Sequence, residues 1–178
     1  MTVGQEIGDR ELVEAARGGD EEAFEILYRR YREYVLIIAS RYGVTGAAAL
    51  DVLQETFFYF FRKLPEFELR ARFSTFLYPV VKNLSLKKKA EASRVIGYEN
   101  GGIDIASLPS PEGTEDPGAR LLELVVSLPE EQKETLLLRF ADGMSLGEIA
   151  AALDIPLGTV KSRLHNALAA LRRQEEST

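Results

Sequence analysis

Apolar residues recur along most of this chain at three- and four-residue steps, which is the spacing of one face of an α-helix. The first stripe follows Asp20, a residue type that caps helix N-termini, and Gly43 ends it. A second helix is predicted from about 46 to 64, where Pro65 stops it, and a third begins near Arg72. The residues expected to face inward are Phe24, Leu27, Tyr28, Tyr31, Val35, Ile38, Leu50, Leu53, Phe57, Phe60, Phe61, Leu64, Phe73, Leu77, Val80, Val81 and Leu84.

Residues 120–178 predict several shorter helices. Ser127 and Pro129 indicate the start of one of them, with Ser as the cap. Its expected core positions are Leu136, Leu137, Leu138 and Phe140. Ser145 followed three residues later by Glu148 is a capping box, which predicts the start of the next helix.

The stretch from 145 to 171 has the layout of a helix-turn-helix. Its short first helix carries the small Ala150, Asp154 suits a left-handed turn residue, and a longer helix follows from about 157 to 174. The start of that last helix carries polar and basic side chains that fit base edges and phosphates: Thr159, Lys161, Ser162, Arg163, His165 and Asn166. The alternative is a plain helical hairpin whose polar face is merely solvated.

Residues 95–119 differ in composition from both of their flanks. They contain five acids, no base and several Gly and Pro, so they cannot bury enough apolar surface to offset the cost of ordering. We interpret them as a flexible acidic linker between a domain at 1–94 and a domain at 120–178. The predicted fold class is therefore all-α, with two small helical domains.

The net charge of −6 is distributed unevenly. Residues 62–94 carry nine Lys or Arg against three Asp or Glu, and such a local basic field steers a polyanion whatever the total charge. The chain has no Cys, and its single His165 lacks neighbours at metal-ligand spacing, so no metal and no cofactor are expected. No apolar run approaches the roughly 20 residues that cross a bilayer, and residues 1–10 lack a secretory signal, so we expect a soluble intracellular protein.

Motifs in both parts of the chain resemble one protein family. Three runs in the C-terminal part, at 128–140, 143–150 and 155–164, resemble region 4 of the sigma-70-family RNA polymerase sigma factors. Three runs in the N-terminal part, at 19–31, 51–57 and 73–83, resemble region 2 of the same family. A short linker stands where larger members have a further domain, so the chain most resembles the extracytoplasmic-function (ECF) group, the smallest members of the family.

This resemblance implies the function and the partners. The chain would direct promoter-specific transcription initiation in the cytoplasm, binding the β′ clamp helices and the β flap of core RNA polymerase. It would recognise the −35 element as duplex and the −10 element as a single strand, and would help to melt the promoter. It would have no catalytic activity, no cofactor and no contact with membranes. Whether an anti-sigma factor controls it stays open.

The resemblance also implies roles for individual residues. In the family, the polymerase-binding face matches Asp51, Gln54, Glu55 and Phe58, although a solvated polar face would have the same spacing. The −10 strand would contact Phe67, Arg70, Arg72, Phe76, Lys82, Asn83 and Lys87, with Asn83 as the base-reading residue. Further aromatic surface is expected from Phe73 and Tyr78, although Phe73 suits the core equally well, and further phosphate contacts from Lys88 and Lys89.

Three positions depart from the family pattern. Phe76 stands where Trp is usual, which retains a smaller stacking surface. Pro79 stands where Arg is usual, which removes a charge and is expected to kink its helix. Asn166 stands where Arg is common, which puts one −35 contact in doubt.

Three rival functions remain to be weighed against a sigma factor. A helix-turn-helix repressor or activator would need a ligand pocket or a dimer seam, and the sequence indicates neither. An enzyme would need a nucleophile–base pair, a phosphate loop or a metal cluster, which the sequence also lacks. The departure at Pro79 keeps open a polymerase-binding regulator that has lost DNA reading.

Overall fold

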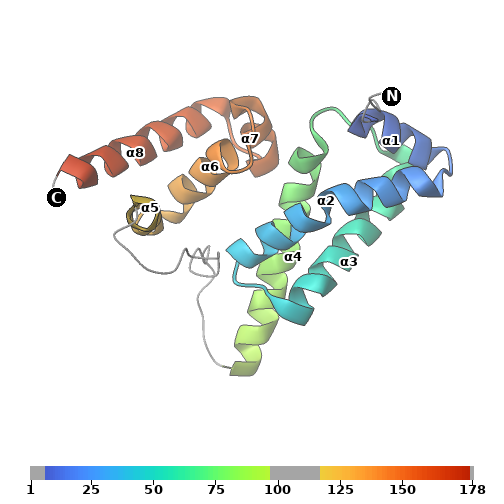
Figure 1. The fold of residues 1–178 in the computed structure, drawn as a ribbon, viewed down its shortest axis with the longest axis horizontal. Helices are drawn as coiled ribbons and strands as arrows, with labels where there is room; N and C mark the ends of the chain where they lie inside the picture. Colours follow the sequence, from blue (N-terminus) through green and yellow to red (C-terminus); the bar gives the residue numbers. More distant parts are fainter. Residues whose placement is uncertain (1–6, 97–116, 177–178) are drawn as a thin grey trace.

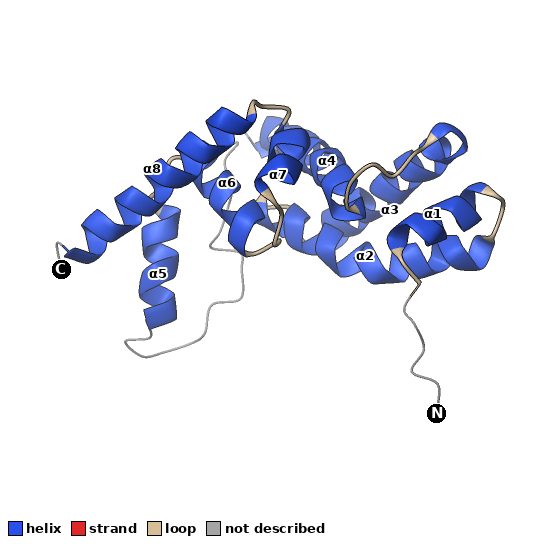
Figure 2. Cartoon of the chain, turned by 90° about the horizontal axis from the view of Figure 1, so that it is seen from above, coloured by secondary structure: helices blue, strands red, loops and turns tan. Residues whose placement is uncertain are grey.

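The computed structural model describes residues 7–96 and 117–176, so most of the predicted linker lies outside the described residues. Within these two ranges all regular structure is helical, which confirms the all-α prediction (Figures 1 and 2). The elements are α1 (Asp9–Arg17), α2 (Glu21–Arg41), α3 (Gly46–Lys63), the 3-10 helix η1 (Leu64–Glu66), α4 (Phe73–Ile96), α5 (Pro117–Val126), α6 (Glu130–Phe140), α7 (Leu146–Leu153) and α8 (Leu157–Glu176).

Helices α1 to α4 form the N-terminal half of the molecule (Figure 1). Its core is rich in large side chains with no exposed surface, among them Leu27, Ile38, Phe60 and Phe73. The rings of Phe60 and Phe73 meet edge to face, with centroids 4.8 Å apart. Burial of each such side chain contributes roughly 1.5–3 kcal/mol, which is the main force that packs α2, α3 and α4 together.

Helices α5 to α8 form the C-terminal half, in which α6, α7 and α8 pack around a second core (Figure 1). Leu138, Met144, Ile149 and Val160 are fully buried. The two halves also touch, because α7 lies against α4 (Figure 2).

Three predicted helix boundaries are confirmed in atomic detail. The Asp20 carboxylate accepts hydrogen bonds from the backbone N–H groups of Glu22 and Ala23, at 2.9 and 3.1 Å. Ser145 and Glu148 form the reciprocal capping box, with bonds of 2.8 and 3.2 Å. Asp154 ends α7 in the left-handed conformation, at φ 53°, and so sets the turn into α8.

Two local predictions miss features of the fold. No helix is predicted before Asp20, yet α1 packs on α2 and buries Leu12 and Val13. The predicted cap at Ser127 is wrong, because Ser127 lies past the end of α5 and its hydroxyl donates to the carbonyl of Leu124 at 2.8 Å. Pro129 precedes α6 instead, without a side-chain cap.

Three residues expected in the core are exposed. Leu50 and Phe61 on α3 are 53% and 58% exposed, and Phe140 at the end of α6 is 64% exposed. Their helical spacing alone does not separate a core position from an apolar surface position. Pro79 lies inside α4, which continues as one helix from Phe73 to Ile96.

Candidate nucleic-acid and polymerase interfaces

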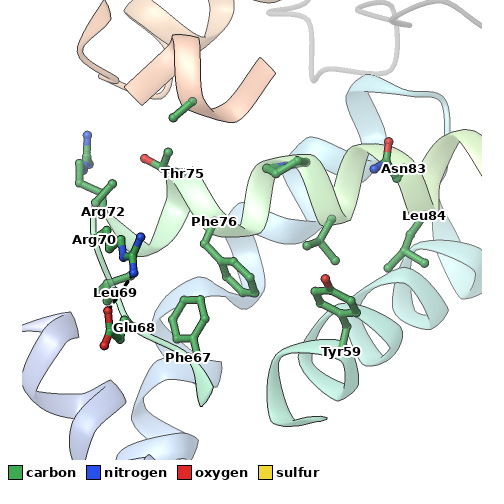
Figure 3. A pocket seen from close by; sticks show the side chains of 14 residues that line it. Tyr59, Phe67, Glu68, Leu69, Arg70, Arg72, Thr75, Phe76, Asn83 and Leu84 are labelled. Atoms are coloured by element: carbon green, nitrogen blue, oxygen red, sulfur yellow. Dashed lines mark hydrogen bonds and ion pairs between the residues drawn. The ribbon is translucent and has the colours of Figure 1, made fainter. Parts of the chain in front are cut away.

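A cavity of about 580 Å³ opens beside α4 (Figure 3). It is largely apolar, and its walls come from α3, from the segment that joins η1 to α4, from one face of α4 and from one residue of α7. The lining residues are Tyr59, Phe67, Glu68, Leu69, Arg70, Ala71, Arg72, Thr75, Phe76, Pro79, Val80, Asn83, Leu84 and Ala151. We refer to it as the aromatic cavity.

Three aromatic rings give the cavity its chemistry. Phe67 and Phe76 lie with ring centroids 4.5 Å apart, and Tyr59 stacks on Phe76 at 6.3 Å with an interplanar angle of 20° (Figure 3). All three side chains are half-buried, so each keeps part of a ring accessible. Such a surface suits an unstacked base, because base–aromatic stacking contributes about 1–3 kcal/mol per base.

The structure brings together five of the seven predicted −10 residues. Phe67, Arg70, Arg72, Phe76 and Asn83 line the aromatic cavity (Figure 3). The Asn83 side chain is exposed, so its amide is accessible to a ligand.

The other two predicted −10 residues, Lys82 and Lys87, lie on α4 but do not line the cavity. Lys87 is exposed, whereas Lys82 donates to the Glu134 carboxylate of α6 at 2.6 Å. Arg72 also contacts the C-terminal half, since its guanidinium donates to the carbonyl oxygen of Gly143 at 3.0 Å.

The expected aromatic surface is smaller than predicted. Phe73 is fully buried, which agrees with its alternative role in the core, and Tyr78 is 2% exposed, so neither ring can stack on DNA. The Tyr78 hydroxyl instead donates to Glu134 at 2.6 Å. Burial, together with the neighbouring Tyr42 and Glu134, raises the pKa of Tyr78 far above its usual value, so its hydroxyl stays protonated.

One of the predicted phosphate contacts is already used within the N-terminal half. Lys88 forms ion pairs with Glu55 at 3.2 Å and Asp51 at 3.3 Å, and hydrogen bonds from these two carboxylates raise its pKa. These contacts tie α4 to α3, so Lys88 serves the packing of the bundle.

The polar start of α8 is accessible, as a helix that reads duplex DNA requires. Its inward positions Val160, Leu164 and Ala167 are buried. The predicted −35 residues Lys161, Ser162, His165 and Asn166 are exposed, and Thr159 and Arg163 are half-buried.

Arg163 differs from the other −35 residues in its contact with α6. Its guanidinium pairs with the Glu131 carboxylate of α6 at 2.7 Å, and its side chain is only 19% exposed. Arg163 therefore has to break an ion pair before it can contact DNA.

The predicted polymerase-binding residues all lie on one outer face of α3. Asp51 and Gln54 are exposed, Glu55 is half-buried, and Phe58 is 61% exposed with the Arg62 guanidinium 5.2 Å from its ring centre. Leu50 and Phe61, two residues expected in the core, lie exposed on the same helix. The surface of α3 is therefore mixed, with apolar anchors among acids, which is typical of a protein-binding surface.

The described residues offer neither a metal site nor a membrane span. None of their His, Asp and Glu side chains form a group of three or more that could hold a metal ion. Over the same residues, none of the helices is both long enough and apolar enough to span a bilayer.

Comparison with known proteins gives matches to both halves of the chain. The family model for Sigma-70 region 2 matches residues 27–95, and the one for Sigma-70, region 4 matches residues 118–171. The ECF RNA polymerase sigma-E factors of Salmonella typhimurium (strain LT2) and Escherichia coli (strain K12) are each 32% identical to this chain, over 94% of this chain and 94% of theirs. The ECF RNA polymerase sigma factor SigW of Bacillus subtilis (strain 168) is 29% identical, over 93% of this chain and 95% of its own length.

Two solved structures share the fold. CnrH in complex with the cytosolic domain of CnrY is similar with a TM-score of 0.66 and 23% identity, over 95% of this chain and 97% of that one. The sigma factor RpoE in complex with the anti-sigma factor NepR from Bartonella quintana is similar with a TM-score of 0.63 and 21% identity, over 86% of this chain and 96% of that one. With both sigma regions matched in order and a relative 32% identical over nearly its whole length, the chain belongs to the sigma-70 family of RNA polymerase sigma factors, in its ECF group.

Proposed function

We propose that this sigma factor directs promoter-specific initiation through two DNA surfaces of different chemistry, the aromatic cavity for the −10 strand and the start of α8 for the −35 duplex. The cavity is the observation that carries the proposal. It joins stackable rings, an accessible Asn83 amide and the cations Arg70 and Arg72 within one concave surface. A base flipped out of the duplex needs all three kinds of contact.

The energy gained by binding an unpaired base in the cavity is similar to the cost of unpairing it, which supports promoter melting by this surface. Unpairing and unstacking one base costs a few kcal/mol. Stacking on Phe76 and Phe67 returns about 1–3 kcal/mol, and hydrogen bonds to Asn83 and phosphate contacts add to this. The cavity thus favours the open strand over the closed duplex, which is what melting requires.

The −35 element is assigned to α8. Lys161, Ser162, His165 and Asn166 form its exposed polar face, and Asn166 can bond an adenine edge where Arg would favour guanine. Arg163 joins them if DNA displaces Glu131.

Core polymerase is assigned to both halves. The β′ clamp helices are expected on the α3 face around Phe58, where Asp51 and Gln54 suit a basic partner and the exposed apolar side chains supply the anchors. The β flap is expected on the C-terminal half, where Phe140 is 64% exposed. An anti-sigma factor is a further candidate partner, since the similar RpoE structure contains one.

The domain boundaries remain those predicted, with a linker at 95–119 between region 2 and region 4. The described helices support this division, because α4 ends at Ile96 and α5 begins at Pro117. We assign no catalytic step and no cofactor to either domain, since the proposed role is recruitment. The place of action is the cytoplasm, where polymerase and promoter DNA meet.

Run-off transcription tests the proposal. Core polymerase, this protein and a library of genomic fragments should yield start sites that share two sequence boxes. Asn83→Ala should relax base preference in the −10 box alone, and Asn166→Ala in the −35 box alone, so that each variant is the control for the other. Start sites that keep the same −10 preference with Asn83→Ala would contradict the assignment of the cavity.

A further inference from the structure

The segment that joins η1 to α4, at 67–72, lies between two hollows, and we refer to it as the dividing loop. Four of its residues line both the aromatic cavity and a second hollow of about 440 Å³: Phe67, Glu68, Leu69 and Arg70 (Figure 3). The rest of the second hollow is lined by one helix, α1, through Arg10, Val13, Glu14 and Arg17. Because space lies on both sides of the dividing loop, its position depends on the few contacts that hold it.

Aromatic packing holds the start of the dividing loop. The ring of Phe67 lies 4.5 Å from that of Phe76 and 5.4 Å from that of Phe60, measured between centroids. Its backbone N–H also donates to the carbonyl of Leu64 at 3.2 Å. Residues 68–71 that follow make no backbone–backbone hydrogen bond within the described part of the chain. The middle of the loop is therefore held by side chains.

Arg10 of α1 supplies such a contact. Its Nη2 atom donates to the carbonyl oxygen of Leu69 at 3.2 Å, from the other side of the second hollow. That carbonyl belongs to the planar peptide group that joins Leu69 to Arg70. Arg70 is one of the cations that we assign to the −10 strand, so the bond from Arg10 fixes the point from which this cation extends.

Helix α1 is itself fixed on α2, which gives Arg10 a defined position. Asp9, the neighbour of Arg10, pairs with Arg30 of α2 at 2.6 Å and accepts a hydrogen bond from the Tyr31 hydroxyl. One turn further along α1, Leu12 and Val13 are buried in the core. A residue that positions a binding surface has to be held by contacts of this kind.

We propose that Arg10 is a positioning residue for −10 recognition, which holds the dividing loop from α1 and so sets the shape of the aromatic cavity and its base preference. The proposal rests on the proposed function, in which this cavity receives the −10 strand. A binding surface discriminates well only when its groups are held within about 0.5 Å of their productive geometry. The loop carries Phe67 and Arg70, so a shift of the loop moves both a stacking ring and a cation.

Two variants of the full-length chain test the role of Arg10. Arg10→Met removes the donor and keeps an unbranched side chain. Arg17→Met is the matched control, because Arg17 is also exposed, lies on the same helix and lines the same hollow, but makes no hydrogen bond to the loop within the described part of the chain. Each variant therefore loses one positive charge from the same surface, and only one loses the bond to Leu69.

Transcription with core polymerase from a promoter library with a randomised −10 box gives the first readout. Arg10→Met should lower the ratio of transcription between the preferred and the other bases about threefold to tenfold, the effect of one hydrogen bond, whereas Arg17→Met should keep the wild-type ratio. A loss of stability lowers transcription from every promoter by the same factor, so it leaves this ratio unchanged. A phosphate contact also acts about equally on all sequences. An unchanged base ratio in Arg10→Met would therefore overturn the proposal.

The second readout follows the loop without polymerase or DNA. The chain has no Trp, so Phe76→Trp introduces a single indole at the position that contacts Phe67 of the loop. In this background Arg10→Met should increase the quenching of Trp fluorescence by acrylamide, because the loop no longer shields the ring as well, and Arg17→Met should leave it unchanged. Equal quenching in the two variants would overturn the claim that Arg10 holds the loop.

Asn83→Ala in the same promoter library separates the two proposals. If Asn83→Ala alters the −10 base ratios and Arg10→Met does not, the assignment of the cavity stands and only the positioning role of Arg10 fails. If Asn83→Ala leaves the ratios unchanged, the assignment of the cavity fails, and the role of Arg10 in recognition fails with it. The quenching experiment still reports in that case whether Arg10 holds the loop.

Discussion

The two surfaces that we assign to promoter DNA differ in their polarity and in their exposure to solvent. The aromatic cavity is concave and largely apolar, and α7 of the other half forms part of its wall. The face of α8 is polar, and four of its six assigned residues are exposed. The cavity is built from α3, α4, α7 and the segment that joins η1 to α4, whereas the polar face belongs to the single helix α8.

The difference follows from the form of DNA that each surface receives. A flipped base has to be stacked on apolar rings, and apolar rings left open to water are costly and prone to unwanted association. A duplex presents phosphates and base edges. Charged and amide side chains can bind these groups and remain fully solvated in the free protein. A strand-capturing surface is therefore concave and partly buried, whereas a duplex-reading surface can stay exposed.

The largest effect is expected from the stacking surface. Phe76→Ala should lower run-off transcription about tenfold to a hundredfold, because one base loses a stacking partner worth about 1–3 kcal/mol. Phe76→Trp should retain or increase activity, since it enlarges the ring. Thermal unfolding of both variants serves as the control for folding, because Phe76 also contacts Phe60 and Phe67. Equal activity of the Ala and Trp variants would show that stacking on the side chain at position 76 does not contribute to transcription.

A smaller effect is expected at the α3 surface, which is exposed like α8 but binds protein. Phe58→Ala should weaken binding to core polymerase about tenfold, because truncation of a central apolar anchor costs about 1–2 kcal/mol. Competition against a labelled wild-type sigma factor measures the affinity. Without polymerase, Phe58→Ala should bind a fluorescent single-stranded oligo(dT) as the wild-type protein does. Altered strand binding would show that α3 does more than bind polymerase.

The exposed face of α8 predicts a salt-dependent effect. Lys161→Ala should weaken −35 duplex binding about equally for all sequences and reduce the slope of log K against log salt by about one, as expected for one phosphate contact. Arg163→Ala should have the smaller effect of the two, because DNA has to displace Glu131 from Arg163 first. Glu131→Gln removes that competition and should raise duplex affinity. Fluorescence anisotropy over a salt series measures all three variants.

The smallest effect concerns the start of α7, the first helix of the helix-turn-helix. Ser145→Ala should lower the free energy of unfolding by about 1 kcal/mol, the usual cost of a lost N-cap. Denaturant unfolding measures it, and Ser162→Ala on the exposed face of α8 is the matched control.

The same cap predicts a dependence on pH. Because hydrogen bonds from Ser145 lower the pKa of Glu148 in the folded chain, its contribution is complete above the unfolded value of 4.5 and is lost as the pH falls through the lower folded value. Below pH 4.5 the free energy of unfolding should therefore fall less in Glu148→Gln than in the wild-type protein. If the free energy of unfolding falls at acid pH by the same amount in Glu148→Gln, Glu148 is not the source of that fall.

The sequence predicted local structure where a few neighbouring residues decide it. Asp20 and the Ser145–Glu148 pair cap helices through bonds that span two or three residues, and Asp154 takes a left-handed turn. The same local logic failed at Ser127, where Pro129 separates the Ser from α6. Helix α1 was missed although Leu12, Val13 and Ala16 show the helical spacing that would have found it.

The sequence by itself determined the helical class, the family and the polar face of α8, because periodicity, caps and short motifs are encoded within single elements. Only the tertiary structure decided which apolar positions are buried, so that Phe73 enters the core while Leu50 and Phe61 face outward. It alone paired Arg41 with Asp142, 101 residues away, and brought Tyr42, Tyr78 and Lys82 to Glu134. No local pattern encodes such pairs, since a charge or a hydroxyl gains its partner only when distant helices pack together.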